Sequence, residues 1–341
     1  MLFNTVFLKG SFMKKINRHS IISSLVKLTI IILFISSFTA VFGSQEALTS
    51  VSAITGILIF FYVPLNLSVK TGALVTGGSF FILGLLASLN LFLPIGLSLI
   101  INLLSIFLMI CLFGRPFAYK LYVPYILLYI FASTTSPLEF KLSIRIAALA
   151  FSALIITGIY YFRHQKSSGT ETLKSMLTIK SIPHEILHVA FTMAVGISLT
   201  LLVSQILHFE KAMWICMTIM SLSQIETQMF KDRFKQRMFG SLIGIVVYGI
   251  LFSLLVPSHL HLPLTLFLAF VYNFLDDYFL QVILITVNAL YAANVIWQFN
   301  VASINRLLFI LIGSLIVYAL TRFVKSSYPQ RLLNLIPNKS N

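Results

Sequence analysis

The sequence predicts an all-α membrane protein, a polytopic transmembrane helical bundle of about twelve spans built as two parallel six-helix repeats. Of its 341 residues, 58% are hydrophobic and only 10% are charged, and the mean hydropathy is +0.97. Apolar stretches of about 20 residues, the length that crosses a hydrocarbon core of about 30 Å, follow one another with short polar breaks. The alternation of polar and apolar residues that is typical of a membrane barrel does not occur. We therefore expect the lipid bilayer to be a partner of this protein and to contact most of its surface.

Twelve apolar runs are the predicted spans, with boundaries defined to within about 2–4 residues. They are residues 21–40, 47–63, 72–89, 92–113, 121–136, 142–162, 186–207, 211–229, 238–256, 262–275, 279–297 and 303–321. The first run follows Lys14, Lys15 and Arg18 and is longer than the apolar part of a signal peptide, so we expect it to stay uncleaved. Met13 precedes this basic group and is a second candidate start, which makes 1–12 an expected unstructured or missing segment.

The basic residues predict the orientation. With the N-terminus in the cytoplasm, only four of the 24 Lys and Arg residues lie on the outer side, which leaves twenty inside: the outer four are Lys141, Arg145, Lys211 and Arg306. Such an excess of basic residues on one side indicates the cytoplasmic face. It also accounts for most of the net charge of +15 without a nucleic-acid partner. We expect a bacterial cytoplasmic membrane location, with both termini cytoplasmic.

The chain divides around one long polar stretch, the predicted cytoplasmic linker 163–185. The first repeat is expected at 21–162 and the second at 186–323, with cytoplasmic tails at 1–20 and 324–341. Landmarks recur about 165 residues apart; the matching pairs are Glu46 and Glu210, Gly72 and Gly240, and Arg145 and Arg306. Because six spans bring each repeat back to its starting side, a duplication predicts a pseudo-twofold axis along the membrane normal.

Arg145 and Arg306 are the principal candidates for substrate binding. Each is expected about one turn inside the outer end of its span, at the helix N-terminus, where a cation opposes the helix dipole. A helix N-terminus and an arginine together attract an anion, so the pair predicts a shared anion-binding vestibule. The alternative is that each guanidinium extends to the outer headgroups.

Three further residues complete the candidate substrate-binding set. Arg237 and its basic neighbours are expected to concentrate anions on the inner side, and Lys211 lies at the outer start of the eighth span. Glu226 lies in the inner part of that span, where an ionised carboxylate is costly unless it is paired. A salt bridge with the basic run 231–237 or a role in proton coupling would explain it.

The pattern His184-Glu185-x-x-His188 is an H-E-x-x-H motif, which on a helix places two imidazoles on one face for zinc. Pro183 predicts that a helix starts at this point, so the motif would occupy a first turn at the membrane surface. Asp276 and Asp277 are the candidates for a third ligand. The alternative is a polar helix start, in which the negative charge of Glu185 is favourable near the positive end of the helix dipole. We expect no metal or other cofactor, and the sequence has no G-x-x-x-x-G-K-[ST] phosphate loop.

The second half carries a layout that resembles a known family. A span opens at Glu210-Lys211-Ala212-Met213-Trp214, a basic stretch follows at 231–237, and Arg237-x-x-Gly240-x-x-x-Gly244 begins the next span. This resembles the fusaric acid resistance-like family, relatives of the aromatic acid exporters, most clearly over 187–322. The first half, with Lys70-Thr71-Gly72, is a weaker match. Larger members carry a big cytoplasmic domain between the halves, where this chain has only the short linker.

The resemblance implies export of small, often aromatic, organic anions across the cytoplasmic membrane, with no enzymatic activity. Two alternatives remain open from the sequence: an intramembrane zinc metalloprotease using the motif at 184–188, and a non-transporting membrane assembly partner. No pattern in the sequence fixes an oligomeric state.

Overall fold

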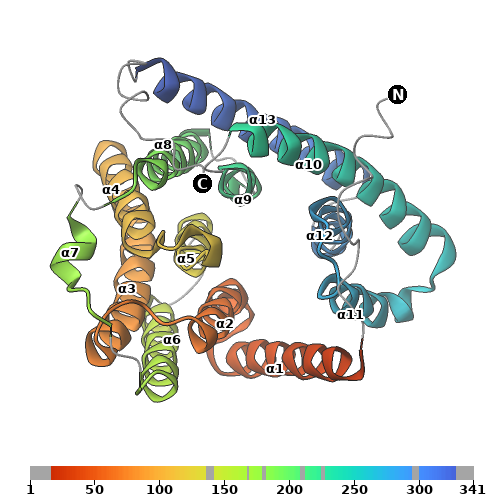
Figure 1. Cartoon of the computed structure of the whole chain (residues 1–341). Helices are drawn as coiled ribbons and strands as arrows, with labels where there is room; N and C mark the ends of the chain where they lie inside the picture. Colours follow the sequence, from red (N-terminus) through yellow and green to blue (C-terminus); the bar gives the residue numbers. More distant parts are fainter. Residues whose placement is uncertain are drawn as a thin grey trace, which may run out of the picture. The chain divides into compact units, whose positions relative to one another are not determined.

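A computed structural model describes residues 17–135, 142–166, 169–178, 182–207, 212–223, 227–293 and 299–327, and these are all-helical apart from their connections (Figure 1). The predicted all-α class is therefore confirmed. Eight helical stretches of this part of the chain are long and apolar enough to cross a membrane. They contain α1 (Arg18–Phe42), α2 (Ala47–Tyr62), α3 (Val69–Leu89), α4 (Ile95–Phe113), α6 (Leu142–Arg163), α8 (His184–Leu207), α10 (Thr227–Tyr248) and α13 (Phe299–Ser327).

Four further apolar helices are shorter: α5 (Val123–Thr134), α9 (Ala212–Leu222), α11 (His261–Tyr272) and α12 (Tyr278–Ala293). Each of the twelve predicted spans overlaps one of these helices. Within the described ranges, eight helical stretches have the length that crosses a bilayer, so the count of twelve and the two repeats stay predictions. The expected unstructured segment 1–12 lies outside the described residues.

The largest departure from the predicted span boundaries lies between the eighth and ninth spans. The eighth span was expected over 211–229, but α9 ends at Leu222, and the basic run 231–237 belongs to α10 instead of a loop. The physical reason is composition: Lys, Arg, Gln, Met and Phe all tolerate a helix, and no Gly or Pro interrupts 227–239. The charged run and the apolar span that follows therefore form one continuous helix.

The chain clusters into two compact units. Unit 1 comprises Met1–Leu33 and Gln228–Ile312, and unit 2 comprises Phe34–Thr227 and Gly313–Asn341. Both α1 and α13 therefore contribute to each unit. The domain boundaries expected from the sequence, with one six-helix repeat on each side of the linker, stay predictions.

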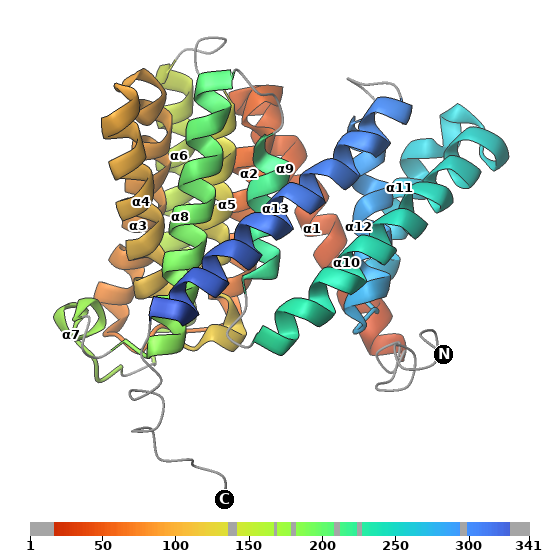
Figure 2. The same ribbon diagram turned by 90° about the horizontal axis from the view of Figure 1, so that it is seen from above.

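Unit 2 is built around α5, which Figure 1 shows end-on among α2, α3, α4, α8 and α9. Every residue of 124–132 is buried, which explains why this short helix is apolar on all sides. The ring of Tyr125 stacks on Phe113 with centroids 4.1 Å apart, and the Tyr125 hydroxyl donates to the carbonyl of Thr76 over 3.0 Å. Figure 2 shows these helices side by side along their length.

Glycines bring α3 and α6 into close contact. A Cβ atom added at Gly77 would clash with the side chain of Thr157 and would lie 2.5 Å from the carbonyl oxygen of Ala153. One added at Gly72 would lie 2.5 Å from the hydroxyl of Tyr160. The small residues predicted to permit close helix approach therefore form a seam along most of α3.

The predicted linker contains a short helix, α7 (Leu173–Leu177). Thr172 and Ser175 form a capping box at its start, which holds the first turn. Ahead of it, the backbone N–H of Glu171 donates to the carbonyl of Asn66 over 3.0 Å, and the Asn66 amide donates to the Glu171 carboxylate over 3.1 Å. The linker is thereby attached to the connection between α2 and α3.

Unit 1 contains α10, α11 and α12. After Tyr248 the helix α10 continues as a π-helix over Gly249–Leu255, where Phe252 packs against Tyr291 of α12 with centroids 5.5 Å apart. His261 at the start of α11 bonds to the carbonyl of Val256 over 2.9 Å and contacts the Phe252 ring. An aromatic cluster therefore joins one end of all three helices.

Candidate functional site

Unit 1 contains two buried arginines, close enough for their charges to interact. Arg237 of α10 is 6% exposed and Arg306 of α13 is 4% exposed. The Nη1 atom of Arg237 donates to the hydroxyl of Tyr278, the first residue of α12, over 3.2 Å. The charges of Arg237 and Arg306 repel one another, and Tyr278 interacts with Arg306 as well. We call Arg237, Arg306 and Tyr278 the arginine cluster.

A third cation borders this cluster. The guanidinium carbon of Arg233 lies 4.8 Å from the centre of the Tyr278 ring, a cation–π arrangement. Arg233 and Arg237 are four residues apart and therefore project from one face of α10. The phenol ring of Tyr278 thus contacts one arginine through its face and the other through its hydroxyl.

Close packing of α10 against α12 positions the cluster. A Cβ added at Gly240 would lie 3.0 Å from Val282, and one added at Gly244 would lie 2.8 Å from Thr286 and 2.9 Å from the carbonyl of Ile283. Between the two glycines, the hydroxyls of Ser241 and Thr286, both buried, lie 3.2 Å apart in a hydrogen bond. The Gly-x-x-x-Gly pattern thereby brings Arg237 to the start of α12.

This arrangement favours an anion. Guanidinium groups stay protonated in proteins, and their planar N–H groups match carboxylate, sulfonate and phosphate oxygens. Because charges interact more strongly away from water, two buried guanidiniums that repel one another gain more from a nearby anion than surface arginines do. The chemistry of the cluster is therefore binding of oxyanions.

The structure brings together two candidate residues that the sequence analysis had expected on opposite sides of the membrane. Arg306 was expected near the outer side and Arg237 on the inner side, whereas both interact with Tyr278 inside unit 1. Tyr278, Ser241 and Thr286 were not candidates. The only sequence signal for Tyr278 was its place at the start of a span, directly after Asp276 and Asp277.

Arg145 lies in unit 2 and is held by neighbouring groups. Its Nε atom donates to the Glu46 carboxylate over 2.9 Å, and both side chains are 1% exposed. Its Nη1 atom donates to the carbonyl of Thr135 over 3.2 Å, and Nη2 donates to the hydroxyl of the same residue over 3.1 Å. The Glu46 carboxylate also accepts from Thr49 over 2.6 Å. The guanidinium therefore joins the start of α6 to the ends of α2 and α5.

Arg145 and Arg306 belong to different units, and the vestibule predicted from their symmetry stays a prediction. The other two candidates, Lys211 and Glu226, lie outside the described residues.

The H-E-x-x-H motif occupies the first turn of α8, as Pro183 predicted. His184 and Glu185 are exposed, and His188 is half-buried. Among the described residues, no group of three His, Cys, Asp or Glu side chains gathers at one point, and Asp276 is exposed. Nothing in this part of the chain thus gives the motif a third ligand.

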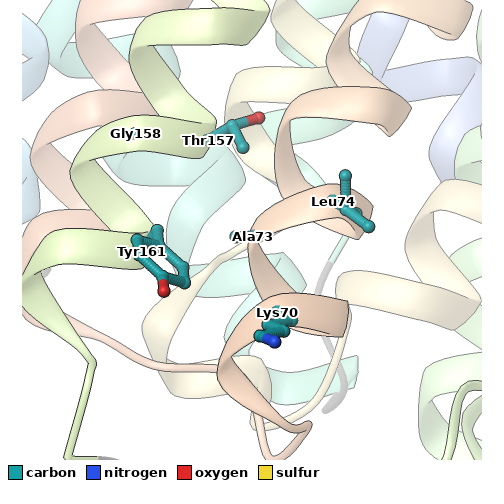
Figure 3. A pocket seen from close by; sticks show the side chains of 6 residues that line it. All are labelled: Lys70, Ala73, Leu74, Thr157, Gly158 and Tyr161. Atoms are coloured by element: carbon teal, nitrogen blue, oxygen red, sulfur yellow. The ribbon is translucent and has the colours of Figure 1, made fainter.

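Two surface hollows are distinct from the arginine cluster. One, of about 390 Å³, is a shallow groove between α3 and α6, where Lys70 and Tyr161 lie at one end of an apolar surface formed by Ala73, Leu74, Thr157 and Gly158 (Figure 3). The other, of about 700 Å³, lies beside the linker and is lined by Tyr62, Val63, Pro64, Asn66, Arg115, Pro116, Tyr119, Glu171 and Met176. Both belong to unit 2, whereas the buried arginines that favour an anion are in unit 1.

Comparison with known proteins agrees with the resemblance seen in the sequence. No curated protein and no solved structure matches the chain. Its apolar helices make the chain a multi-pass membrane protein. Residues 197–320, which include the whole arginine cluster, match the family described as fusaric acid resistance protein-like, and this confirms over these residues the resemblance expected from the sequence.

Proposed function

We propose that the chain moves small organic anions, aromatic ones included, across the cytoplasmic membrane, and that the arginine cluster contacts them. The observation that carries the proposal is the burial of two arginines, Arg237 and Arg306, close enough in unit 1 for their charges to repel one another, with Arg237 bonded to the hydroxyl of Tyr278. All three residues lie within the family-matched region. Family resemblance supplies the expected direction, which is export.

The cluster suits an aromatic anion in two ways. Its guanidinium groups match the planar oxyanion of the solute. The Tyr278 ring, whose face already accommodates Arg233, provides aromatic surface at the same place. The packing of Gly240 and Gly244 on α12 supports this geometry, because it fixes the spacing between Arg237 and Tyr278.

A flux assay on the full chain in proteoliposomes tests the proposal. Benzenesulfonate is the probe, because its sulfonate stays ionised and leaks slowly through lipid, and trimethylanilinium is the matched cation. We expect saturable flux of the sulfonate only. A charge-assisted hydrogen bond contributes about 1.5–3 kcal/mol. Arg306→Gln or Arg237→Gln should therefore raise the benzenesulfonate concentration at half-maximal flux about ten- to hundredfold.

Matched variants separate binding from folding. Arg322→Gln removes a guanidinium from the same helix, α13, where it is exposed and bonded only weakly to Tyr318 over 3.3 Å, and flux should persist. Arg306→Lys retains the charge and should recover part of the lost flux. Unchanged sulfonate flux in correctly inserted Arg306→Gln and Arg237→Gln proteins would remove the cluster from the pathway. Absence of sulfonate flux in the native chain would contradict transport of such anions.

A further inference from the structure

A further buried polar cluster lies in unit 2, at residues that are not among the candidates from the sequence. Asn90 follows α3 and is 2% exposed, and Asn102 lies in α4 and is 1% exposed. The Nδ2 atom of Asn90 donates to Oδ1 of Asn102 over 2.6 Å, and the hydroxyl of Tyr129 in α5 donates to the same oxygen over 2.6 Å. One amide oxygen thus joins three elements.

Each asparagine also has a buried polar atom without a hydrogen-bond partner among the described residues. These are Oδ1 of Asn90, which needs a donor, and Nδ2 of Asn102, which needs an acceptor. The neighbours support this assignment of the amide atoms, because exchanging nitrogen and oxygen would place the Asn90 oxygen against the carbonyl oxygen of Ser98 and would remove the acceptor of the Tyr129 hydroxyl. Burying such groups without partners is unfavourable, and native structures satisfy nearly all of them.

From these contacts we infer that the Asn90–Asn102–Tyr129 cluster binds water inside unit 2. The unsatisfied atoms identify the occupant by their chemistry. A cation would meet the amide N–H of Asn102 and an anion would meet the carbonyl of Asn90, so neither ion is accepted by both. Water donates to one and accepts from the other, and buried waters occupy sites with polar partners of this kind.

A chain of polar contacts connects this site to the end of the helices. The side chain of Asn90 also lies 3.4 Å from the carbonyl of Ser98, and the Ser98 hydroxyl donates to the half-buried Gln205 of α8 over 3.2 Å. Asn102 is seven residues beyond the start of α4, a depth of about 10 Å along the helix. The polar groups therefore extend from the asparagines to Gln205, and the proposal places water exchange on that side.

X-ray radiolysis of the full chain in lipid nanodiscs tests the inference, because radiolysis of a bound water produces hydroxyl radicals at the site itself. Tyr125 is the internal control: it is as deeply buried as Tyr129 on the same helix, but it donates to the Thr76 carbonyl. Tandem mass spectrometry resolves the two. We expect oxidation of Tyr129 to be several-fold faster than that of Tyr125, and equal rates would overturn the proposal.

Two further measurements sharpen the test. Radicals made only in bulk solvent, by peroxide photolysis, should leave both tyrosines nearly unoxidised, and fast photolytic labelling of Tyr129 would show ordinary exposure in place of bound water. In folded Asn90→Leu or Asn102→Leu protein, X-ray labelling of Tyr129 should fall towards the Tyr125 rate. Undiminished labelling in both variants would contradict the assigned water ligands.

Discussion

Arg145 and Glu46 form a buried ion pair, with the guanidinium Nε atom 2.9 Å from the carboxylate and each side chain 1% exposed. The two residues are 99 positions apart, at the start of α6 and immediately before α2. Because Thr135 at the end of α5 accepts from the same guanidinium, the pair holds three helices of unit 2 at one level.

Breaking this pair should destabilise the protein. Arg145→Gln leaves the Glu46 carboxylate buried without its cation, and removing one member of a buried pair costs about 3–5 kcal/mol. Unfolding in mixed detergent, followed by circular dichroism, measures the loss. Glu46→Gln should cost a similar amount, whereas the double variant should lose less than the sum of the two single changes.

The exposed Arg322→Gln change is the control for this prediction and should leave the free energy of unfolding nearly unchanged. Flux per folded molecule separates the two roles considered for Arg145. A purely structural role leaves that flux intact in Arg145→Gln, whereas the predicted vestibule requires it to fall. Additive losses in the double variant would contradict an energetic coupling between the two side chains.

Gly77 and Gly78 are neighbours in α3 with opposite surroundings. A Cβ at Gly77 would meet Thr157 and the Ala153 carbonyl, whereas one at Gly78 would meet nothing within 4 Å. We expect Gly77→Ala to destabilise the protein by about 1–3 kcal/mol through overpacking. Gly78→Ala should be neutral or stabilising, by up to about 1 kcal/mol, because alanine favours helix. The same unfolding assay checks both, and equal effects would show that the seam relaxes freely.

The sequence predicted the class and the positions of the helices because apolar length is a local property. It did not predict which residue on another helix each of these residues contacts, because those contacts depend on tertiary packing. Gly72 and Gly240 match by spacing, yet Gly72 packs on Tyr160 of α6 and Gly240 packs on Val282 of α12. Likewise, Arg145 and Arg306 look equivalent in sequence, but one meets a carboxylate and the other lies beside a second arginine.

The seam between α10 and α12 should control flux without contacting the solute. Gly244→Val would force the backbone of α12 away near Ile283 and Thr286, and so would move Tyr278 relative to Arg237. We expect a lower maximal rate of benzenesulfonate flux in proteoliposomes. Gly158→Val is the matched control, since an added Cβ there meets nothing within 4 Å. Flux equal to the native rate in folded Gly244→Val protein would show that the seam does not position the cluster.

Cysteine labelling tests the predicted orientation, and the native chain provides a low background. Cys111 and Cys216 are free but buried, so a membrane-impermeant maleimide should not label them in intact cells. Lys174 in α7 and His259 before α11 are both exposed, and the excess of basic residues predicts that they face opposite sides of the membrane.

His259→Cys should react in intact cells, because 257–261 is predicted to be outside. Lys174→Cys should react only after the membrane is permeabilised, because the linker is predicted to be cytoplasmic. The reverse pattern would invert the topology, and labelling of both from outside would mean that the number of crossings between the two positions is even.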